Sequence, residues 1–255
     1  MYLKSITSLT FSVLCSGIIF AAEQTPDADQ LLRQMSAKLA AAQIFSFEAE
    51  REIDASLIEG APAAVKARVS AVVQRPNKLA VIAKSASGVR RFVADGSTLT
   101  LFDGKSNFYS VIPMQTSIDG LVEKVDKVYG FTAPLAEFAI SDPYKDFRKQ
   151  AKSVSYLGRG RTSHGLFGLF GVECHRLWLA GKDADAELWI GVHDQLPYRL
   201  DATFHREGQP KVHIDFLKWN LTAKVTAGEF TFTPPNGSQK IDMVSSEKMQ
   251  SAGKK

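Results

Sequence analysis

Apolar residues after position 25 first recur at helical spacing, at Leu31, Leu32, Met35 and Leu39. This period predicts one amphipathic helix that runs to about Ala42. Thr25 and Pro26 are typical of a helix start, with the hydroxyl as the cap and the proline where its missing N–H does no harm. Asp27 and Asp29 then lie near the positive end of the helix dipole. The helix therefore has an apolar stripe that can cover another element.

From residue 45 onward apolar and polar residues alternate, which is the period of a strand with one apolar face. The alternation predicts strands at 45–50, 65–73, 79–84, 89–94, 98–102 and 108–112. Asp95-Gly96 and Asp103-Gly104 are typical of tight turns between the later strands. Strands are expected again at 172–179, 186–192, 198–205, 211–219 and, as a short last one, 230–232. The whole pattern predicts a meander of antiparallel hairpins.

The middle of the chain interrupts this meander with segments of helical character. A helix is predicted at 117–128, with four apolar residues on one face: Leu121, Val122, Val125 and Val128. A second helical segment is expected at 134–140, and Asp142-Pro143 indicates a further turn. These segments are candidates for a cover over the sheet.

A glycine-rich stretch at 158–171 holds five glycines among large apolar residues. The apolar residues are Leu166, Phe167, Leu169 and Phe170. We interpret the stretch as a mobile loop with an apolar tip. Two roles stay open: Phe167 and Phe170 fold back to plug the core or the mouth of a cavity, or they form an exposed patch that contacts a membrane or a partner.

The first 22 residues have the features of a secretory signal peptide. A short basic start ending at Lys4 precedes an apolar run at 6–20, and Ala21-Ala22 supplies the small residues of a cleavage site. We therefore expect an exported, periplasmic protein with a cleaved signal peptide at 1–22; an uncleaved anchor is the alternative. Residues 23–244 are predicted to form a single domain, because no linker separates two cores, and residues 245–255 a polar flexible tail.

Composition and charge narrow the function. With 45% hydrophobic and 23% charged residues, the chain can bury a sizeable core. The formal charge is +4, or +3 without Lys4, and the cations are interspersed with acids. We therefore expect no nucleic-acid partner and only weak contact with a membrane surface. Cys174 is the one cysteine outside the signal, so no internal disulfide is expected; it is interpreted as a small buried residue, with a cross-link between chains as the alternative.

The residues that carry common chemistry do not form a catalytic or metal-binding motif. None of the five histidines has the helical spacing of a metalloprotease, and the neighbours Cys174 and His175 point to opposite faces of a strand. The acids Asp183, Asp185 and Glu187 are explained by a solvated turn and strand start. No nucleophile elbow or phosphate-binding loop occurs. We therefore expect no catalytic residues, no metal, no cofactor and no enzymatic activity.

Three short motifs carry a resemblance to a known family. They are Arg-Pro-Asn-Lys-Leu at 75–79, Val-Ala-Asp-Gly-Ser-Thr-Leu at 93–99 and Phe-Thr-Phe-Thr-Pro-Pro-Asn-Gly at 230–237. Their sequences and order resemble the periplasmic carrier of outer-membrane lipoproteins, the LolA/LolB-like superfamily. The likeness extends from about Asp27 to about Asp242. Within the superfamily the chain looks most similar to an uncharacterised group of predicted periplasmic proteins.

The resemblance implies a mainly β (α+β) fold. In this fold a strongly curved antiparallel sheet forms an unclosed half-barrel, and helices cover its apolar concave face as a lid. Arg75 matches the arginine that hydrogen-bonds the lid and holds it closed, and Leu79 matches an apolar position near the cavity mouth. Gln74 and Leu79 depart from the carrier, which has a lysine and an aromatic residue there. The residues expected to bind ligand or hold the lid are Arg75, Leu79, Val69, Val73, Leu31 and Met35.

The function expected from this resemblance is binding or carriage of lipid, acyl chains or acylated proteins in an apolar cavity. Burial of a chain of about ten methylenes offers roughly 8 kcal/mol before losses, which is ample for binding. The alternative is a sensory or regulatory module of the envelope that binds a protein partner with the same fold. A further alternative is an ordinary core in which the helices fill the concave face completely.

Overall fold

The computed structural model describes residues 25–58, 60–131, 133–163 and 171–245. Twelve strands within these ranges form one sheet with the order β12-β6-β5-β4-β3-β2-β1-β11-β10-β9-β8-β7. The strands are β1 (Ile44–Ile53), β2 (Val65–Gln74), β3 (Lys78–Ser85), β4 (Gly88–Ala94), β5 (Thr98–Asp103), β6 (Phe108–Pro113), β7 (Ala151–Arg161), β8 (Glu173–Gly181), β9 (Ala184–Gly191), β10 (Pro197–Phe204), β11 (Lys211–Asn220) and β12 (Gln239–Lys240).

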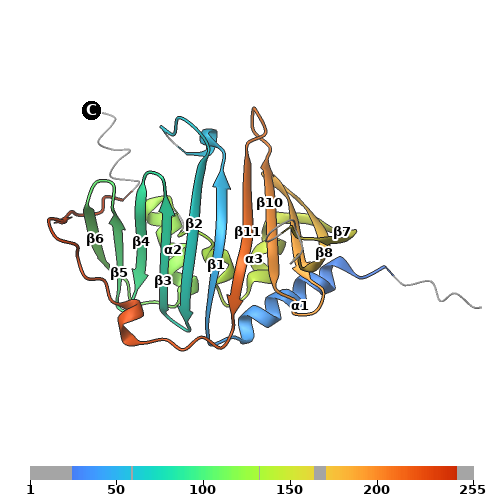
Figure 1. Ribbon diagram of the computed structural model, residues 1–255, viewed down its shortest axis with the longest axis horizontal. Coiled ribbons are helices and arrows are strands. Elements are labelled where there is room, and N and C mark those ends of the chain that lie inside the picture. The colour runs from blue at the N-terminus through green and yellow to red at the C-terminus, as the bar shows by residue number, and fades with distance from the viewer. Residues whose placement is uncertain (1–24, 59, 132, 164–170, 246–255) are drawn as a thin grey trace, which may run out of the picture.

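The sheet consists of two runs of hairpins that meet at its centre. Strand β1 pairs with β2 on one side and with β11, which is distant in sequence, on the other. All neighbours are antiparallel except the short β12, which pairs parallel with β6. Strands β12 and β7 are the two edges, so the sheet is not closed. This confirms the predicted mainly β fold with an open half-barrel (Figure 1).

Three helices and short 3-10 turns accompany the sheet. The helices are α1 (Ala28–Ala41), α2 (Ile118–Tyr129) and α3 (Pro143–Gln150), and the 3-10 turns include η1 (Ala55–Leu57), η2 (Ala136–Phe138) and η4 (Ala227–Phe230). The cap of α1 is Asp27 rather than the predicted Thr25. The Asp27 carboxylate accepts hydrogen bonds from the backbone N–H groups of Asp29 at 2.9 Å and Gln30 at 3.4 Å. A carboxylate also carries a negative charge, which the positive end of the helix dipole stabilises and which a hydroxyl lacks.

The core lies between the helices and one face of the sheet, which we call the concave face. In β1, Phe45, Phe47 and Ala49 are at most 2% exposed and alternate with more exposed polar residues. The apolar stripe of α1 belongs to the same core, and its central residues Leu32 and Met35 are fully buried. Figure 1 shows α2 and α3 behind the sheet. The predicted cover over an apolar face is therefore present.

Two elements replace segments that the sequence pattern predicted differently. Asp142-Pro143 opens helix α3 instead of a turn: the Asp142 carboxylate accepts from the Lys145 N–H at 3.0 Å, and Pro143 occupies the first helical turn. Gly158 and Gly160, interpreted as part of a loop, lie in strand β7. This edge strand has a register shift between Tyr156 and Gly158, which breaks the alternation by which strands are detected.

The C-terminal prediction was also wrong in detail. The expected strand at 230–232 is replaced by the 3-10 turn η4 and an extended segment, and the last strand is β12. Other predictions lie outside the described residues: the signal peptide, the apolar tip with Phe167 and Phe170, and nearly all of the tail. Within the described residues, no helix has the length and apolar character needed to cross a membrane.

Candidate functional site

A narrow apolar crevice lies between the concave face and helix α2. The space between its side chains amounts to about 320 Å³ when the solvent at its open side is counted, but only about 10 Å³ of it has room for a water-sized sphere. Strands β3 to β5 supply the floor, α2 supplies the roof, and the segment after α2 closes one side; the lining residues are Leu79, Phe92, Ala94, Leu99, Leu121, Val122, Val125, Phe131 and Ala133. All of these residues are apolar. The lining therefore suits an alkyl group and offers no partner for a polar one, but side chains fill nearly all of the crevice in this arrangement.

Helix α2 is fixed over the floor by contacts at its first turn. The Ser117 hydroxyl accepts from the Gly120 N–H at 3.3 Å, and the Ile118 N–H donates to the Pro76 carbonyl at 2.8 Å. The Asp119 carboxylate accepts from both the backbone N–H and the hydroxyl of Ser141, at 2.9 and 2.7 Å. The first turn of α2 is thus tied to the β2–β3 turn and to the segment that follows η2.

Arg75, at the end of β2, joins two cover segments to the sheet. Its Nη1 and Nη2 donate to the carbonyls of Ala139 and Ile140, both at 2.9 Å, just after η2. Nε and Nη2 also reach the carbonyls of Ala42 at 3.2 Å and Leu39 at 3.5 Å, at the end of α1. One guanidinium therefore binds the C-terminal end of α1 and the η2 segment together.

The environment of Arg75 keeps it a cation although it is half-buried. Burial lowers the pKa of its guanidinium, and the Asp119 carboxylate acts in the opposite direction. Four carbonyl oxygens and the face of Phe45, whose ring centre lies 5.5 Å from the guanidinium carbon, replace water around the charge. Because each carbonyl belongs to a cover segment, displacing either segment would uncover donors on a desolvated charge.

The structure brings only some of the predicted ligand and lid residues together. Leu79 lines the crevice, and Arg75 lies four residues before it at the turn that contacts α2. Val69, Val73 and Met35 are fully buried, and Leu31 is half-buried against the same core; none of these four lines the crevice. The crevice instead uses Leu121, Val122 and Val125, the apolar face predicted for α2, together with sheet residues that sequence reasoning did not single out.

A second tie fixes α3 against α1. The Tyr144 N–H donates to the Ser36 hydroxyl at 2.8 Å, and the Tyr144 hydroxyl donates to the Asp29 carboxylate at 3.0 Å. The guanidinium of Arg33 stacks over the Tyr144 ring at 4.0 Å, and Arg148 lies 3.4 Å from Asp29. Helices α1 and α3 are therefore cross-linked to each other, and η2 is joined to them through the Phe138 ring, whose centre lies 5.8 Å from that of Phe147 in α3, and through Arg75.

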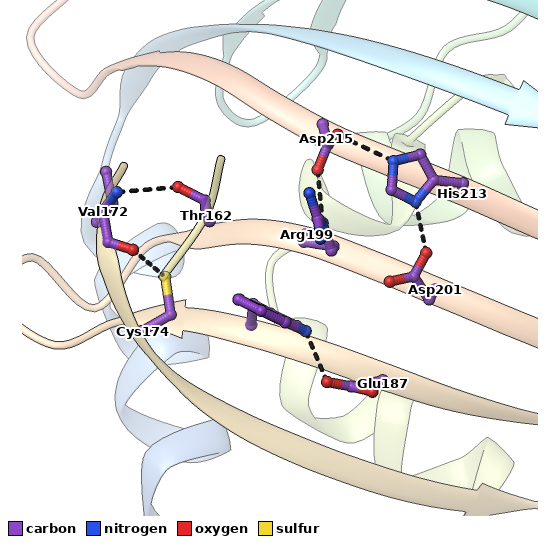
Figure 2. A network of polar contacts seen from close by, with 9 residues as sticks. Thr162, Val172, Cys174, Glu187, Arg199, Asp201, His213 and Asp215 are labelled. Atoms are coloured by element: carbon purple, nitrogen blue, oxygen red, sulfur yellow. Dashed lines mark hydrogen bonds and ion pairs between the residues drawn. The ribbon is translucent and has the colours of Figure 1, made fainter. Parts of the chain in front are cut away.

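The opposite, convex face carries a polar network across β8 to β11, shown in Figure 2. Asp215 accepts from Arg199 at 2.8 Å and contacts His213 at 2.9 Å, while the other ring nitrogen of His213 contacts Asp201. Burial lowers the pKa of His213, but the hydrogen bonds to Asp201 and Asp215 outweigh it and raise the pKa. These groups satisfy one another across two strands, which indicates a structural role.

An aromatic ladder continues this network. The Trp189 ring lies between the guanidinium carbons of Arg176 and Arg199, at 5.1 and 5.0 Å, and Glu187 accepts from both Trp189 and Arg176. Nearby, Cys174 is fully buried, and burial together with the Asp194 charge raises the pKa of its thiol to about 12. Cys174 is therefore the small buried residue expected from sequence. The described part of the chain contains no cluster of three or more histidine, cysteine or acidic residues suited to a metal.

Comparison with known proteins identifies a family. The model of the family described as "Predicted periplasmic protein (DUF2092)" matches residues 28–244. This confirms the predicted resemblance to a group of predicted periplasmic proteins and the periplasmic location. No curated protein matches the sequence.

Several solved structures are similar to this chain at low identity. A chain of the Pseudomonas aeruginosa MucA/MucB complex has 13% identity and a TM-score of 0.43. The match covers 82% of this protein but only 62% of the chain from the complex. The LolA superfamily protein NE2245 from Nitrosomonas europaea has 12% identity and a TM-score of 0.38, with 81% and 99% covered. A putative outer membrane lipoprotein-sorting protein domain from Vibrio parahaemolyticus has 9% identity and a TM-score of 0.34, with 80% and 95% covered.

Proposed function

The chain belongs to the DUF2092 family of predicted periplasmic proteins, and we propose that it binds the acyl chain of a lipid or of an acylated protein between its concave face and helix α2. The observation that carries this proposal is the wholly apolar contact between the floor and α2, at a site where the helix is held over the sheet by polar contacts at its first turn. The contact is closed in this arrangement, so binding depends on α2 moving away from the floor.

The size of the crevice defines what binding requires. The room it has for a water-sized sphere is only about 10 Å³, far below the roughly 300–1,000 Å³ typical of ligand pockets. Binding of an acyl chain therefore requires α2 to move away from the floor. Each methylene buried contributes about 0.8 kcal/mol, so several methylenes offset the loss of one or two hydrogen bonds of the cover.

Arg75 gives this cover two arrangements. In the closed arrangement, its guanidinium binds carbonyls at the end of α1 and in the segment after η2. Entry of a chain under α2 would pull the η2 segment from Arg75, so ligand burial and the Arg75 hydrogen bonds compete. Such competition permits a ligand to be taken up and released without a large net change in free energy.

The test uses two valines of the same helix. Val122 lines the crevice, whereas Val128 is 39% exposed and does not line it. We expect Val122→Trp to fill the crevice and abolish binding of a polarity-sensitive apolar dye such as N-phenyl-1-naphthylamine, measured by fluorescence. Val128→Trp should bind the dye as the unchanged protein does. Circular dichroism checks that both variants fold.

Two results would contradict the proposal. One is that the unchanged protein binds neither the dye nor lipids detectable by mass spectrometry after purification from its envelope. The other is that both tryptophan variants bind the dye equally, which would place the apolar site elsewhere.

A further inference from the structure

Two arginines lie on the concave face, next to the apolar crevice. The register places Ala49, Val69, Ala83 and Arg90 in one row across β1 to β4. Directly paired residues share a face of the sheet, so Arg90 points to the side on which Ala49 is buried. Arg51 follows Ala49 by two residues in β1 and points to the same side. The concave face thus carries one cation in this row, on Arg90, and a second in the next row, on Arg51.

These arginines are incompletely paired. The Nε atom of Arg51 is buried and has no hydrogen-bond partner among the described residues. Arg90 contacts Asp103 only at 4.0 Å, and both side chains are largely exposed, so this ion pair contributes little. Burial lowers the pKa of Arg51; the charge of Glu137 on η2 opposes this effect, and that of Arg90 adds to it. Arg51 is therefore a desolvated cation that lies near the Glu137 carboxyl group and a second cation, Arg90, and its Nε still lacks an acceptor among the described residues.

The arginines lie where the end of a ligand in the crevice would be. Phe92, which lines the crevice, is the next residue after Arg90 on the same face of β4, about 7 Å away along the strand. Glu137 lies in η2, the segment whose following carbonyls Arg75 binds. A chain under α2 that points along β4 would bring its terminal group to Arg90. Arg51 lies across the concave face on β1, one row further along, and its pKa is lowered by burial and by the charge of Arg90.

We propose that Arg90 and Arg51 bind the anionic headgroup of the ligand whose acyl chain occupies the crevice. This inference rests on the proposed function and adds the chemical class of the ligand: an amphiphile with a carboxylate or phosphate at its head. Such a group supplies the acceptor that the buried Nε of Arg51 lacks, and guanidinium groups match carboxylates and phosphates in a bidentate geometry. Asp103 and Glu137 repel any anion, so we expect an anion to bind only when burial of its apolar tail offsets this repulsion, which links headgroup binding to chain binding.

The experiment compares ligands that share a chain and differ in charge. Dodecanoate, dodecyl phosphate and dodecanol each displace the fluorescent dye from the unchanged protein and from the variants Arg51→Gln and Arg90→Gln. We expect Arg51→Gln to weaken both anionic ligands by about tenfold or more, the effect of losing one charge-assisted hydrogen bond, and to leave dodecanol unchanged. Arg90→Gln should act in the same direction with a smaller effect, because its side chain is exposed. Comparing the two anions shows which headgroup the site prefers.

Arg68→Gln is the matched control, since Arg68 is exposed on β2 and pairs with Glu48 at 2.8 Å away from the crevice. The inference is overturned if the Gln variants weaken dodecanol as much as the anions, or if they behave as Arg68→Gln does. Should Arg51→Gln not fold, the Arg90→Gln variant and the salt dependence of anion binding decide the question. If none of the three ligands displaces the dye, but the dye binds and Val122→Trp abolishes this binding, the headgroup inference fails and the proposed apolar site stands.

Discussion

Replacing Arg75 by leucine separates a lid contact from a structural one. The leucine keeps most of the apolar stem of the side chain and removes every donor. Four carbonyls then lose a partner: Ala139 and Ile140 after η2, and Leu39 and Ala42 at the end of α1. The hydrogen bond from the Arg75 backbone N–H to Gln43, at 2.9 Å, is unaffected and keeps β2 in place.

The magnitude follows from the two short hydrogen bonds. At 2.9 Å each is well formed, and a hydrogen bond to a charged group contributes about 1.5–3 kcal/mol. The two longer hydrogen bonds, to the carbonyls of Ala42 and Leu39, contribute little. Removing the half-buried charge also removes its desolvation cost. We therefore expect the cover to be destabilised by about 2–4 kcal/mol relative to the sheet. This corresponds to an increase of about 30- to 700-fold in the population of the open cover.

Hydrogen exchange of individual backbone amides measures this effect directly. Amides of the η2 segment, such as that of Ala139, should exchange faster by about that factor in Arg75→Leu, and so should amides of α2, which Asp119 joins to this segment through Ser141, while amides of β1 and β11 at the centre of the sheet keep their rates. The dye should bind and dissociate faster. Arg68→Leu is the control, because its ion pair with Glu48 is exposed and worth at most about 1 kcal/mol.

A uniform change would refute this reasoning. If the sheet amides accelerate as much as those of α2, Arg75 stabilises the whole fold, and it is no lid contact. If neither set changes, the carbonyls of the cover are satisfied without the guanidinium.

Three further substitutions test other parts of the structure. Phe138→Ala removes a fully buried ring of η2 that packs edge-on against Phe216 at 4.8 Å, and urea unfolding should show a loss of about 3–5 kcal/mol; a loss below about 1 kcal/mol would mean that η2 is not docked. His213→Gln should lower the free energy of unfolding more at about pH 6 than at about pH 9. The reason is that folding raises the pKa of His213, so its protonation adds stability below the unfolded pKa of about 6.5, and this stability is lost as the pH rises through the folded pKa. Equal losses at both pH values would mean that His213 forms no stabilising ion pair with Asp201 and Asp215. Gly160→Ala would place a Cβ 2.7 Å from the Arg176 side chain and 2.9 Å from the Trp189 ring, so the free energy of unfolding should fall by about 1–3 kcal/mol in thermal unfolding. An unchanged unfolding midpoint would mean that these two side chains move aside without a cost in stability.

The sequence predicted elements well where one face of the element is buried. The strict alternation of β1 and β2 follows from a concave face that excludes water, and α2 shows its apolar stripe for the same reason. Helix α3 and strand β7 lack this signal. Among the residues of α3 only Pro143 is buried, and β7 is an edge strand with bulges and mostly polar or small residues. Their structure is imposed by neighbours rather than by their own pattern.

The candidate site was harder to predict than the fold. Alternation shows that Val69 and Val73 point inward, but it does not show what lies above them, and in the structure they are fully buried in the core. The crevice depends on where α2 crosses the sheet, which is set by tertiary contacts such as the Ile118 N–H to the Pro76 carbonyl. Sequence reasoning identified Leu79 because it belongs to the same short motif as Arg75 and Pro76, and Pro76 accepts the hydrogen bond from Ile118.

The distribution of cross-links indicates which part of the cover moves. Helices α1 and α3 are joined through Tyr144 and Asp29, and the strands beneath them carry the ladder of arginines and tryptophan. Beyond its first turn, helix α2 contacts the sheet through apolar residues, and it ends at Gly130, whose φ is 70°. Leu135 also has a positive φ of 62°, a strained conformation for a branched residue. Because a change at Gly130 and Leu135 would relieve that strain, and because α1 stays joined to α3 through Tyr144, we expect ligand entry to displace α2 and the η2 segment while α1 stays in place.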